Sequence, residues 1–238
     1  MKLQTSLEEI AKSLGAFYFG VADLSLARSD PVTPYAQKLV SEYPFAVSIG
    51  VPLSPETVDR IENQKDSTAL LNYWFHVYRM ISPLIDHITS RLTFAIMKEG
   101  YRALPVPATH TLDTENLHGL FSHKMAARLA GQGWIGKSCL LITPDRGPRV
   151  RWGTILSDAP LHPGKPIEKT CEECTICVEA CPAGAFTGRD FEASEPREMR
   201  MKANKCNEFL MERQRNIGAN ICGMCVYICP WGKLKHGY

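Results

Sequence analysis

The chain has 238 residues, of which 45% are hydrophobic and 22% charged, and its formal net charge is +2. That length allows one sizeable core and a smaller module, so we expect two domains. The near-neutral charge gives no strong indication of a nucleic-acid or membrane partner, and the basic patches at 197–205 and 233–236 are expected to be solvated surface. No apolar stretch is long enough to span a bilayer and the first residues do not resemble a secretion signal, so we expect a cytoplasmic protein.

The hydrophobic pattern predicts an α/β (α+β) body in the first two thirds of the chain. Short apolar stretches bounded by turn formers indicate strands, and apolar residues at three- and four-residue spacing indicate helices. In the longest helical stretch, Pro83 is expected to kink or divide the helix and Gly100 to end it. We expect helices at 5–12, 67–98 and 123–130, and strands at 17–21, 46–51, 102–106, 138–143 and 150–156.

A stretch rich in proline, glycine and lysine follows the last predicted strand, at 161–169. Such composition is typical of a connection between folded units. We therefore place a first domain at 1–163 and a second, cysteine-rich domain at 164–238.

Eight of the nine cysteines form two groups in the second domain. The first group has two residues between its first three cysteines and ends in Cys181-Pro182, and the second group, displaced in part to Cys206, ends in Cys229-Pro230. This is the ligand pattern of bacterial ferredoxins with two 4Fe-4S clusters, in which three thiolates of one loop hold one cluster and the fourth reaches the other. We expect one cluster on Cys171, Cys174, Cys177 and Cys229, and the other on Cys181, Cys206, Cys222 and Cys225.

Structural zinc and a disulfide framework are the alternative interpretations of these cysteines. Neither explains three thiols at two-residue intervals followed by Cys-Pro, twice in one short segment. Reducing conditions in the cytosol would also favour thiolate ligands over disulfides. The ninth cysteine, Cys139, lies in an apolar run and is expected to be a buried free thiol.

A glycine-rich stretch at 131–138 matches both the dinucleotide pattern G-x-G-x-x-G and the phosphate-loop pattern G-x-x-x-x-G-K-[ST]. Both mechanisms require a strand before the glycines and a helix after them, so that backbone amides face the phosphates. Here a predicted helix precedes the glycines and a predicted strand follows them. We therefore expect neither nucleotide site, although tight backbone turns of this kind can contact another large cofactor.

Four segments together resemble the epoxyqueuosine reductases and their relatives, the corrinoid-dependent reductive dehalogenases. They are the stretch from Ala130 to Pro144, Trp152-Gly-Thr-Ile-Leu-Ser-Asp158, the first cysteine group, and the stretch from Ile221 to Gly232. A weaker likeness covers 12–23 and 100–107. The resemblance implies a nitroreductase-like domain that holds cobalamin, followed by a ferredoxin-like module with two 4Fe-4S clusters.

The same resemblance implies a path for electrons, from an external low-potential donor of the ferredoxin or flavodoxin type to the clusters and then to cobalt. No D-x-H-x-x-G segment is present, so there is no sign of a histidine that ligates cobalt from below. Lys137 is equally compatible with a cofactor contact and with a plain surface position. The candidate cofactor-binding residues are Val106, Pro107, Gly131, Gly133, Trp134, Ile135, Gly136, Lys137 and Ser138.

The sequence departs from the epoxyqueuosine reductases before the glycine-rich stretch, where that family carries an acidic proton donor. The corresponding segment offers His110, Asp113 and His118 as candidate proton donors, although a polar stretch before a helix is also how loops and caps are made. The missing acidic donor and the few residues after Pro230 lead us to expect a small-molecule substrate in place of tRNA.

Three kinds of function fit these observations. The first is a corrinoid and iron-sulfur reductase. The second is an electron-transfer or activating protein that reduces a corrinoid or flavin on another protein, without substrate chemistry of its own. The third is a flavin enzyme on the same fold, and the visible spectrum of the anaerobically purified protein separates all three.

Overall fold

A computed structural model describes residues 2–27 and 34–233, and its centre is an antiparallel sheet. Every neighbouring pair of strands is antiparallel, and β2 and β6 pair along their whole length, from Phe45 opposite Ser157 to Pro52 opposite Val150. The architecture is therefore α+β. The strand order is β1 (Tyr18–Asp23), β2 (Phe45–Pro52), β6 (Val150–Ser157) and β3 (Ala103–Val106).

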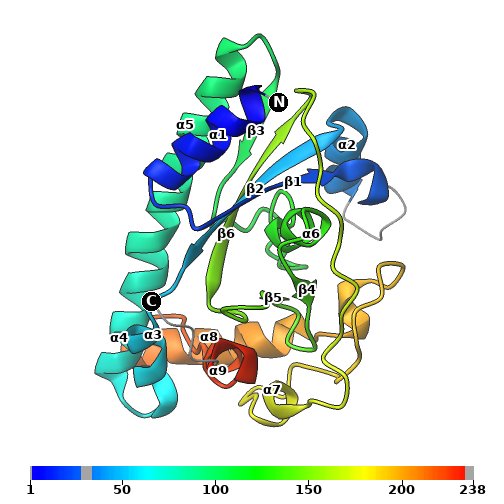
Figure 1. Cartoon of the computed structure of the whole chain (residues 1–238). Coiled ribbons are helices and arrows are strands. Elements are labelled where there is room, and N and C mark those ends of the chain that lie inside the picture. Colours follow the sequence, from blue (N-terminus) through cyan, green and yellow to red (C-terminus); the bar gives the residue numbers. More distant parts are fainter. Residues whose placement is uncertain (1, 28–33, 234–238) are drawn as a thin grey trace.

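Helices cover both faces of this sheet (Figure 1). Alternate residues of the central strands supply the two cores: Val47 and Ile49 face the core beneath α1 (Lys2–Ser13) and α5 (Ser82–Lys98), whereas Ala46 faces the opposite core. Period-two alternation of this kind is what a sheet with two covered faces requires. The second core lies beneath α2 (Pro34–Glu42) and α6 (His123–Leu129).

The long helical stretch is divided, as expected, but by a π-helical segment. It comprises α4 (Ser67–Trp74), the π-helical Phe75–Ile81 and α5. Asp66 caps α4 by accepting hydrogen bonds from two backbone amides, and Pro83 lies in the first turn of α5, where a missing N–H costs nothing. The wider turn absorbs the break that the proline would otherwise cause. Gly100 follows directly on the end of α5, with φ of +86°.

A small hairpin, β4 (Trp134–Ile135) with β5 (Leu141–Ile142), follows α6. The glycine-rich stretch thus follows a helix, contains β4 and is followed by β5, which confirms the reversed order that argues against a nucleotide-binding loop. The strand expected at 138–143 is shorter than expected because Cys139 has a φ of +55°, which turns the chain. β4, within the glycine-rich stretch, was not expected.

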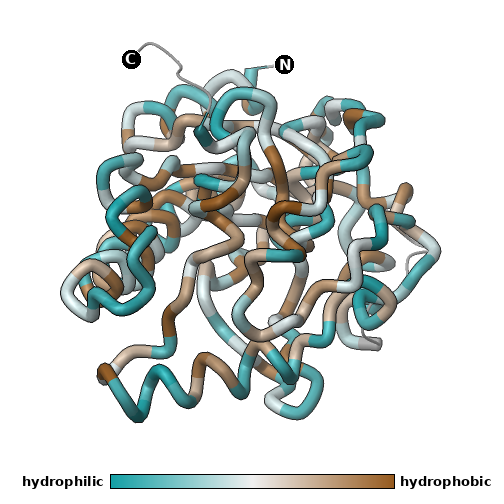
Figure 2. The backbone as a smooth tube through the Cα atoms, turned by 90° about the horizontal axis from the view of Figure 1, so that it is seen from below, coloured by the Kyte–Doolittle hydropathy of each residue, from teal (hydrophilic) through white to brown (hydrophobic). Residues whose placement is uncertain are grey.

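The cysteine-rich segment gathers at one end of the body, below β4 and β5 in Figure 1. Its helices are α7 (Ile176–Glu179), α8 (Ala203–Ile217) and α9 (Met224–Tyr227), and α9 packs on α3 (Pro55–Asp59) and on the 3-10 turn Arg60–Glu62. Further 3-10 turns are Leu24–Ala27, Arg197–Met199 and Pro230–Gly232. Seen from below, many of the hydrophilic stretches lie around the outline of the molecule (Figure 2).

The segment expected to be a linker lies against the body. The Gly164 amide donates a hydrogen bond to the Val21 carbonyl at 2.9 Å, and a Cβ atom at Gly164 would lie 2.4 Å from the Ala130 carbonyl oxygen. The connecting segment therefore packs against both β1 and the end of α6. Most of the basic patch expected at 233–236 lies outside the described residues.

Candidate functional site

The first set of expected cluster ligands lies in one region of the structure, although no three potential ligands are placed as a metal site among the described residues. Burial, and then the charges of Cys171, Cys229 and Cys174, raise the pKa of the Cys177 thiol to about 11. Cys171 and Cys174 lie in the loop before α7, Cys177 lies on α7, and Cys229 comes from the end of the second cysteine group. All nine cysteines of the chain are free thiols in the structure.

The second set combines residues that are much further apart in the sequence. Burial, and then the charges of Cys222 and Cys181, raise the pKa of the Cys206 thiol to about 11. Cys225 is partly buried, and its pKa is raised by burial and then by the charges of Cys222, Cys206 and Cys181, and of Cys177 from the first set. Thiols with raised pKa values are poor thiolates in water, but a bound metal ion replaces the proton and keeps the sulfur charged.

The glycine-rich stretch packs against the cysteine-rich module. A Cβ atom at Gly136 would lie 3.1 Å from the Cys171 sulfur, one at Gly133 would lie 2.2 Å from the Ile142 carbonyl oxygen, and one at Gly131 would lie 2.4 Å from the Lys165 carbonyl oxygen. A side chain at Gly131 or Gly133 would collide with backbone, and one at Gly136 with the side chains of Ile142 and Cys171. The glycines therefore permit close packing within the hairpin and against the segment that carries the clusters.

Two further residues expected at the cofactor also contact the module. Lys137 is buried, and its Nζ donates a hydrogen bond to the Glu172 carbonyl and lies 3.9 Å from the Asp190 carboxylate. It is therefore not a surface lysine, and it is not part of the cavity wall described below. Trp134 makes an edge-to-face contact with Trp231, at a ring-centroid distance of 5.0 Å. Both side chains join the body to the cysteine-rich module.

A cavity of about 500 Å³ lies where the end of β3, the start of α6 and the β4–β5 hairpin meet the segment 191–200 of the cysteine-rich module. Of the residues expected to hold a cofactor, Val106, Pro107 and Ile135 line it. The remaining members of that set do not line it: Gly131, Gly133, Trp134, Gly136, Lys137 and Ser138. The residues that follow the glycine-rich stretch, Cys139 to Leu141, line the cavity instead.

The polar lining of the cavity is rich in cations. Lys124 is partly buried, its Nζ donates to the Cys139 carbonyl at 2.6 Å, and burial lowers its pKa. Arg151 donates to the Thr109 hydroxyl at 2.7 Å. The other lining cations are Arg128, Arg197 and Arg200, and the only lining carboxylate among the described residues is that of Glu195.

His123 forms part of the cavity wall with both ring nitrogens engaged. Its Nδ1 lies 2.8 Å from the Thr154 hydroxyl and its Nε2 lies 3.1 Å from the Pro107 carbonyl. Because a carbonyl only accepts, Nε2 carries the proton and Nδ1 accepts from the hydroxyl. Burial lowers the pKa of His123 to about 4, so the ring is neutral and holds α6 against β6 and the end of β3.

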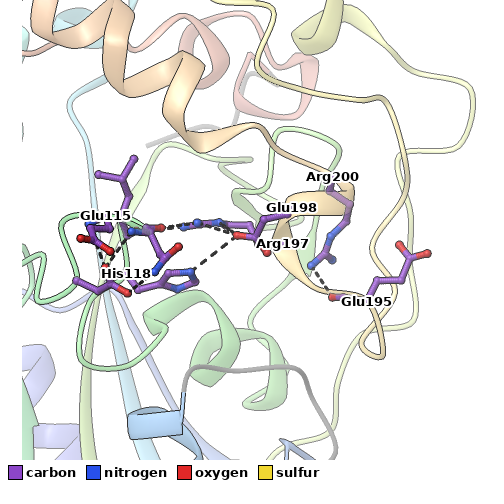
Figure 3. A network of polar contacts seen from close by, with 9 residues as sticks. Glu115, His118, Glu195, Arg197, Glu198 and Arg200 are labelled. Atoms are coloured by element: carbon purple, nitrogen blue, oxygen red, sulfur yellow. Dashed lines mark hydrogen bonds and ion pairs between the residues drawn. The ribbon is translucent and has the colours of Figure 1, made fainter.

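The three expected proton donors differ in position. His110 and His118 line the cavity, and burial lowers the pKa of His118, whose Nε2 lies 3.9 Å from the Glu198 carboxylate (Figure 3). Asp113 does not line the cavity. Its carboxylate accepts hydrogen bonds from Glu115 and Asn116, and the bonds from Asn116 hold its pKa below the ordinary value. It closes a turn, and the expectation that it donates a proton is not supported by this position.

Sequence reasoning missed His123 and the cationic lining. It also expected the patch at 197–205 to be solvated, yet Arg200 is only 7% exposed and Arg197 donates hydrogen bonds to the carbonyls of Asn116 and Leu117. Those carbonyls belong to the loop that carries His118, so Arg197 ties this loop to the module (Figure 3). The available signal in the sequence was that two apolar residues, Met199 and Met201, interrupt the charge run, which indicates that part of it is buried.

The cysteine-rich segment matches a known family. Residues 170–232 match the 4Fe-4S double cluster binding domain. The chain is also 34% identical over 125 residues to epoxyqueuosine reductase from Bacillus cereus, covering 48% of this chain and 30% of that protein. It is 33% identical over 144 residues to epoxyqueuosine reductase from Synechococcus, covering 56% of this chain and 39% of that protein. These alignments thus span well under half of the relatives' length.

Solved structures extend the likeness to the whole fold. Epoxyqueuosine reductase from Bacillus subtilis superposes with a TM-score of 0.66 at 21% identity, covering 100% of this chain and 67% of that chain. A catabolic reductive dehalogenase superposes with a TM-score of 0.68 at 19% identity, covering 95% of this chain and 31% of that chain. A reductive dehalogenase studied for B12-dependent dehalogenation superposes with a TM-score of 0.67 at 19% identity, covering 95% of this chain and 31% of that chain.

One of these neighbours bears on the expected partners. An epoxyqueuosine reductase bound to an epoxyqueuosine-modified tRNA stem loop superposes with a TM-score of 0.62 at 22% identity. The likeness therefore includes a protein that binds nucleic acid, which weakens the expectation that none is a partner. None of the described helices is long and apolar enough to cross a membrane. Residues 170–232 therefore form a double 4Fe-4S domain, and the chain that carries them is similar in sequence and fold to the epoxyqueuosine reductases.

Proposed function

We propose that this protein is an iron-sulfur reductase that passes electrons from two 4Fe-4S clusters to a corrinoid held in the cavity, and from there to a substrate. The observation that carries the proposal is the position of the cavity, which is lined both by the body and by segment 191–200 of the cluster module. A cofactor at that junction would lie beside its electron supply. The kinship to epoxyqueuosine reductases and reductive dehalogenases supports the same interpretation.

The lining fits a corrinoid. A corrin ring is surrounded by amide side chains whose oxygens accept hydrogen bonds, and the cavity offers many N–H donors and an apolar wall that includes Val106, Ile135 and Trp152. His123 is not available as a lower ligand to cobalt, because both of its ring nitrogens already take part in hydrogen bonds. Val106, Pro107 and Ile135 would contact the ring. The group would supply a cobalt centre that accepts single electrons and delivers them to the substrate.

The protein's own contribution to the reaction would be to hold the ligands of both centres and to supply a proton. His118 and His110 are the proposed donors because both line the cavity. His118 is the better placed, since Arg197 and Glu198 beside it fix its loop. Its lowered pKa favours a neutral ring at neutral pH, which can receive a proton and pass it on.

We further propose the division of labour between 1–163, which would bind the corrinoid, and 164–238, which would hold the clusters with the ligand sets given above. An external low-potential protein of the ferredoxin or flavodoxin type would be the electron donor. The alternative, an electron-transfer protein without substrate chemistry, is not favoured, because the relatives are reductases and the cavity is large enough for a ligand of its own.

The test is the visible spectrum of protein purified and reconstituted without oxygen, before and after addition of cobalamin and removal of the unbound excess. We expect iron-sulfur absorption with corrinoid bands that stay with the protein. Absorption from iron-sulfur centres alone would instead support the electron-transfer alternative, and flavin bands would support a flavin enzyme. In either case the corrinoid proposal would fail.

A matched pair of variants locates the cofactor. Ile135→Trp should fill the cavity wall and lower cobalamin binding at least tenfold, because its side chain would occupy ligand space. Phe94→Trp, on an exposed position of α5, adds a similar bulk away from the cavity and should leave binding unchanged. Equal binding by both variants would place the corrinoid elsewhere.

A further inference from the structure

Arg200 is a buried cation without an anionic partner. Its side chain lines the cavity, the residue is 7% exposed, and its Nε and Nη1 atoms have no hydrogen-bond partner among the described residues. Its one protein hydrogen bond is long, from Nη2 to the Glu195 carbonyl at 3.4 Å. A buried charge with unused donors is costly unless a partner reaches it, so this position predicts a ligand.

The protein does not supply that partner. Glu195 carries the one lining carboxylate among the described residues: its Oε1 pairs with Arg189, its Oε2 has no hydrogen-bond partner there, and its side chain points away from Arg200 in Figure 3. Within the described part of the chain, no carboxylate lies within ion-pair distance of Lys124, Arg128, Arg151 or Arg200, all of which line the cavity. Four uncompensated cations around one cavity create a positive potential inside it.

Phe191 positions two of these cations. The guanidinium carbons of Arg128 and Arg200 lie over its ring, at 4.7 and 4.5 Å from the centroid. Each contact is favourable in itself, and together they hold a side chain of α6 and one of the cluster module around the same ring. The two guanidinium groups are therefore ordered before any ligand arrives, which lowers the entropic cost of binding.

We propose that this cavity contains an oxyanion site at Arg200, flanked by Arg128 and Lys124, that takes a phosphate or carboxylate group. Guanidinium groups suit such oxygens because they present several fixed N–H donors. Two sources share this chemistry: the phosphodiester in the nucleotide loop of a cobalamin, and an acidic group on the substrate. The first source rests on the proposed function, whereas the oxyanion site itself does not.

The experiment compares wild-type protein with Arg200→Gln, Arg200→Lys and Arg215→Gln, at low salt and without oxygen. Arg215 is an exposed residue of α8, so its substitution makes the same change in net charge away from the cavity. The probes are cobalamin, cobinamide, which lacks the nucleotide loop and its phosphate, inorganic phosphate and benzoate. Dissociation constants are measured by difference absorbance for the corrinoids and by calorimetry for the anions.

Arg200→Gln should bind the relevant anion ten- to a hundred-fold more weakly than wild type, as expected for a hydrogen-bonded charge that loses its partner. Arg200→Lys keeps the charge but loses the fixed set of N–H donors, so it should bind more weakly than wild type and more tightly than Arg200→Gln. Arg215→Gln should bind like wild type. If the loss is confined to cobalamin and spares cobinamide, the phosphodiester is the bound group. If both corrinoids bind equally and phosphate or benzoate is lost, the site belongs to an acidic substrate.

Equal affinities of wild type and Arg200→Gln for all four probes would overturn the oxyanion site, as would failure of the wild-type protein to bind any of them. Iron content and circular dichroism establish that each variant folds, and Arg200→Lys gives a second test if Arg200→Gln does not. Failure of the proposed function has a different signature: neither corrinoid binds, whereas phosphate or benzoate still binds and is lost in Arg200→Gln.

Discussion

The two cysteine sets differ in how much of the protein they need. Three members of the first set lie within seven consecutive residues, in the loop before α7 and on its first turn, and this segment touches the body where Gly136 approaches Cys171. The second set comes from α8, from the end of the first group, from the loop before α9 and from α9 itself, and it packs against the body. The Cys222 sulfur lies 3.6 Å from the Gln64 side-chain oxygen, and the burial of Tyr73 beside Cys225 and Cys222 raises the pKa of that tyrosine.

This difference means that one cluster is specified mainly by local sequence and the other by tertiary structure. Arg213 of α8 donates hydrogen bonds to Gln64 at 2.9 and 3.2 Å, so Gln64 connects the second set to both the body and α8. Changes in the body near Gln64 and Tyr73 should therefore reach the second cluster before the first, which contacts the body elsewhere, at Gly136 and Trp134. Such selectivity would also separate the two clusters in experiments on electron flow.

The largest effect should come from removing ligands that cross between the groups. We expect Cys181→Ala to lose the same cluster as Cys225→Ala, and Cys229→Ala to lose the same cluster as Cys177→Ala, each with about half of the iron. Iron analysis and electron paramagnetic resonance of the reduced proteins distinguish the two losses. Cys139→Ala is the control and should keep both clusters, because Cys139 is outside both sets.

Identical spectra of Cys181→Ala and Cys177→Ala would show that each group holds its own cluster. That result would contradict the crossed ligand sets and leave the double-cluster assignment intact. The experiment thus tests the pairing of cysteines separately from the number of clusters.

The next effect comes from the body side of the second cluster. Gly223 has φ of +76°, and a Cβ atom there would lie 2.5 Å from a ring carbon of the buried Tyr73 and 2.6 Å from the Ile61 side chain. Gly223→Ala should therefore push the loop between Cys222 and Cys225 off the body and deplete the second cluster. Iron content and paramagnetic resonance should show selective loss of that cluster.

Gly218→Ala is the matched control, since Gly218 has φ of +80° and a Cβ atom at this position would meet only open space. It should cost only the backbone strain of a left-handed residue, about 1–2 kcal/mol, and keep both clusters. If both variants lost iron equally, backbone strain rather than collision with Tyr73 would explain the result, and the dependence of the second cluster on the body would be refuted.

The predictability of the site from sequence follows the same division. The first cysteine group could be recognised because its ligands are neighbours in the chain, and the double-cluster domain is confirmed by the family match. The glycine-rich stretch revealed that the backbone must approach something closely, but glycine spacing does not say what. Its partners are Ile142, Cys171 and Lys165, and only the fold brings them there.

The cavity could not be predicted because its cations come from distant parts of the chain. Arg128 lies on α6, Arg151 on β6 and Arg200 in the cluster module, and no local pattern connects them. A charge run usually marks a solvated surface, yet Arg200 is buried against Phe191. Side-chain stacking between α6 and the cysteine-rich segment is a tertiary property, whereas the helices and central strands followed from local apolar periodicity.

The smallest expected effect should separate the cavity wall from both clusters. His123 has a pKa of about 4 in the folded protein, against about 6.5 when unfolded, because burial disfavours its charged form. Between these values the unfolded chain binds a proton that the folded protein does not, so the stability is complete above pH 6.5 and falls as the pH is lowered toward 4. From pH 6.5 to 5.0 the expected loss is about 2 kcal/mol.

Anaerobic urea unfolding of wild type and His123→Asn at pH 7.5, 6.5 and 5.0, followed by tryptophan fluorescence, measures this term as a difference between the two proteins. His123→Asn should be less stable at pH 7.5, because it loses packing and one of the two hydrogen bonds, but it should show a shallower decline with acid. His87→Asn, at an exposed position of α5, should decline like wild type. Parallel curves for wild type and His123→Asn would mean that His123 can take up a proton without disturbing α6. Iron content should stay constant over this pH range in all three proteins, since His123 acts on the cavity wall and contacts neither cluster.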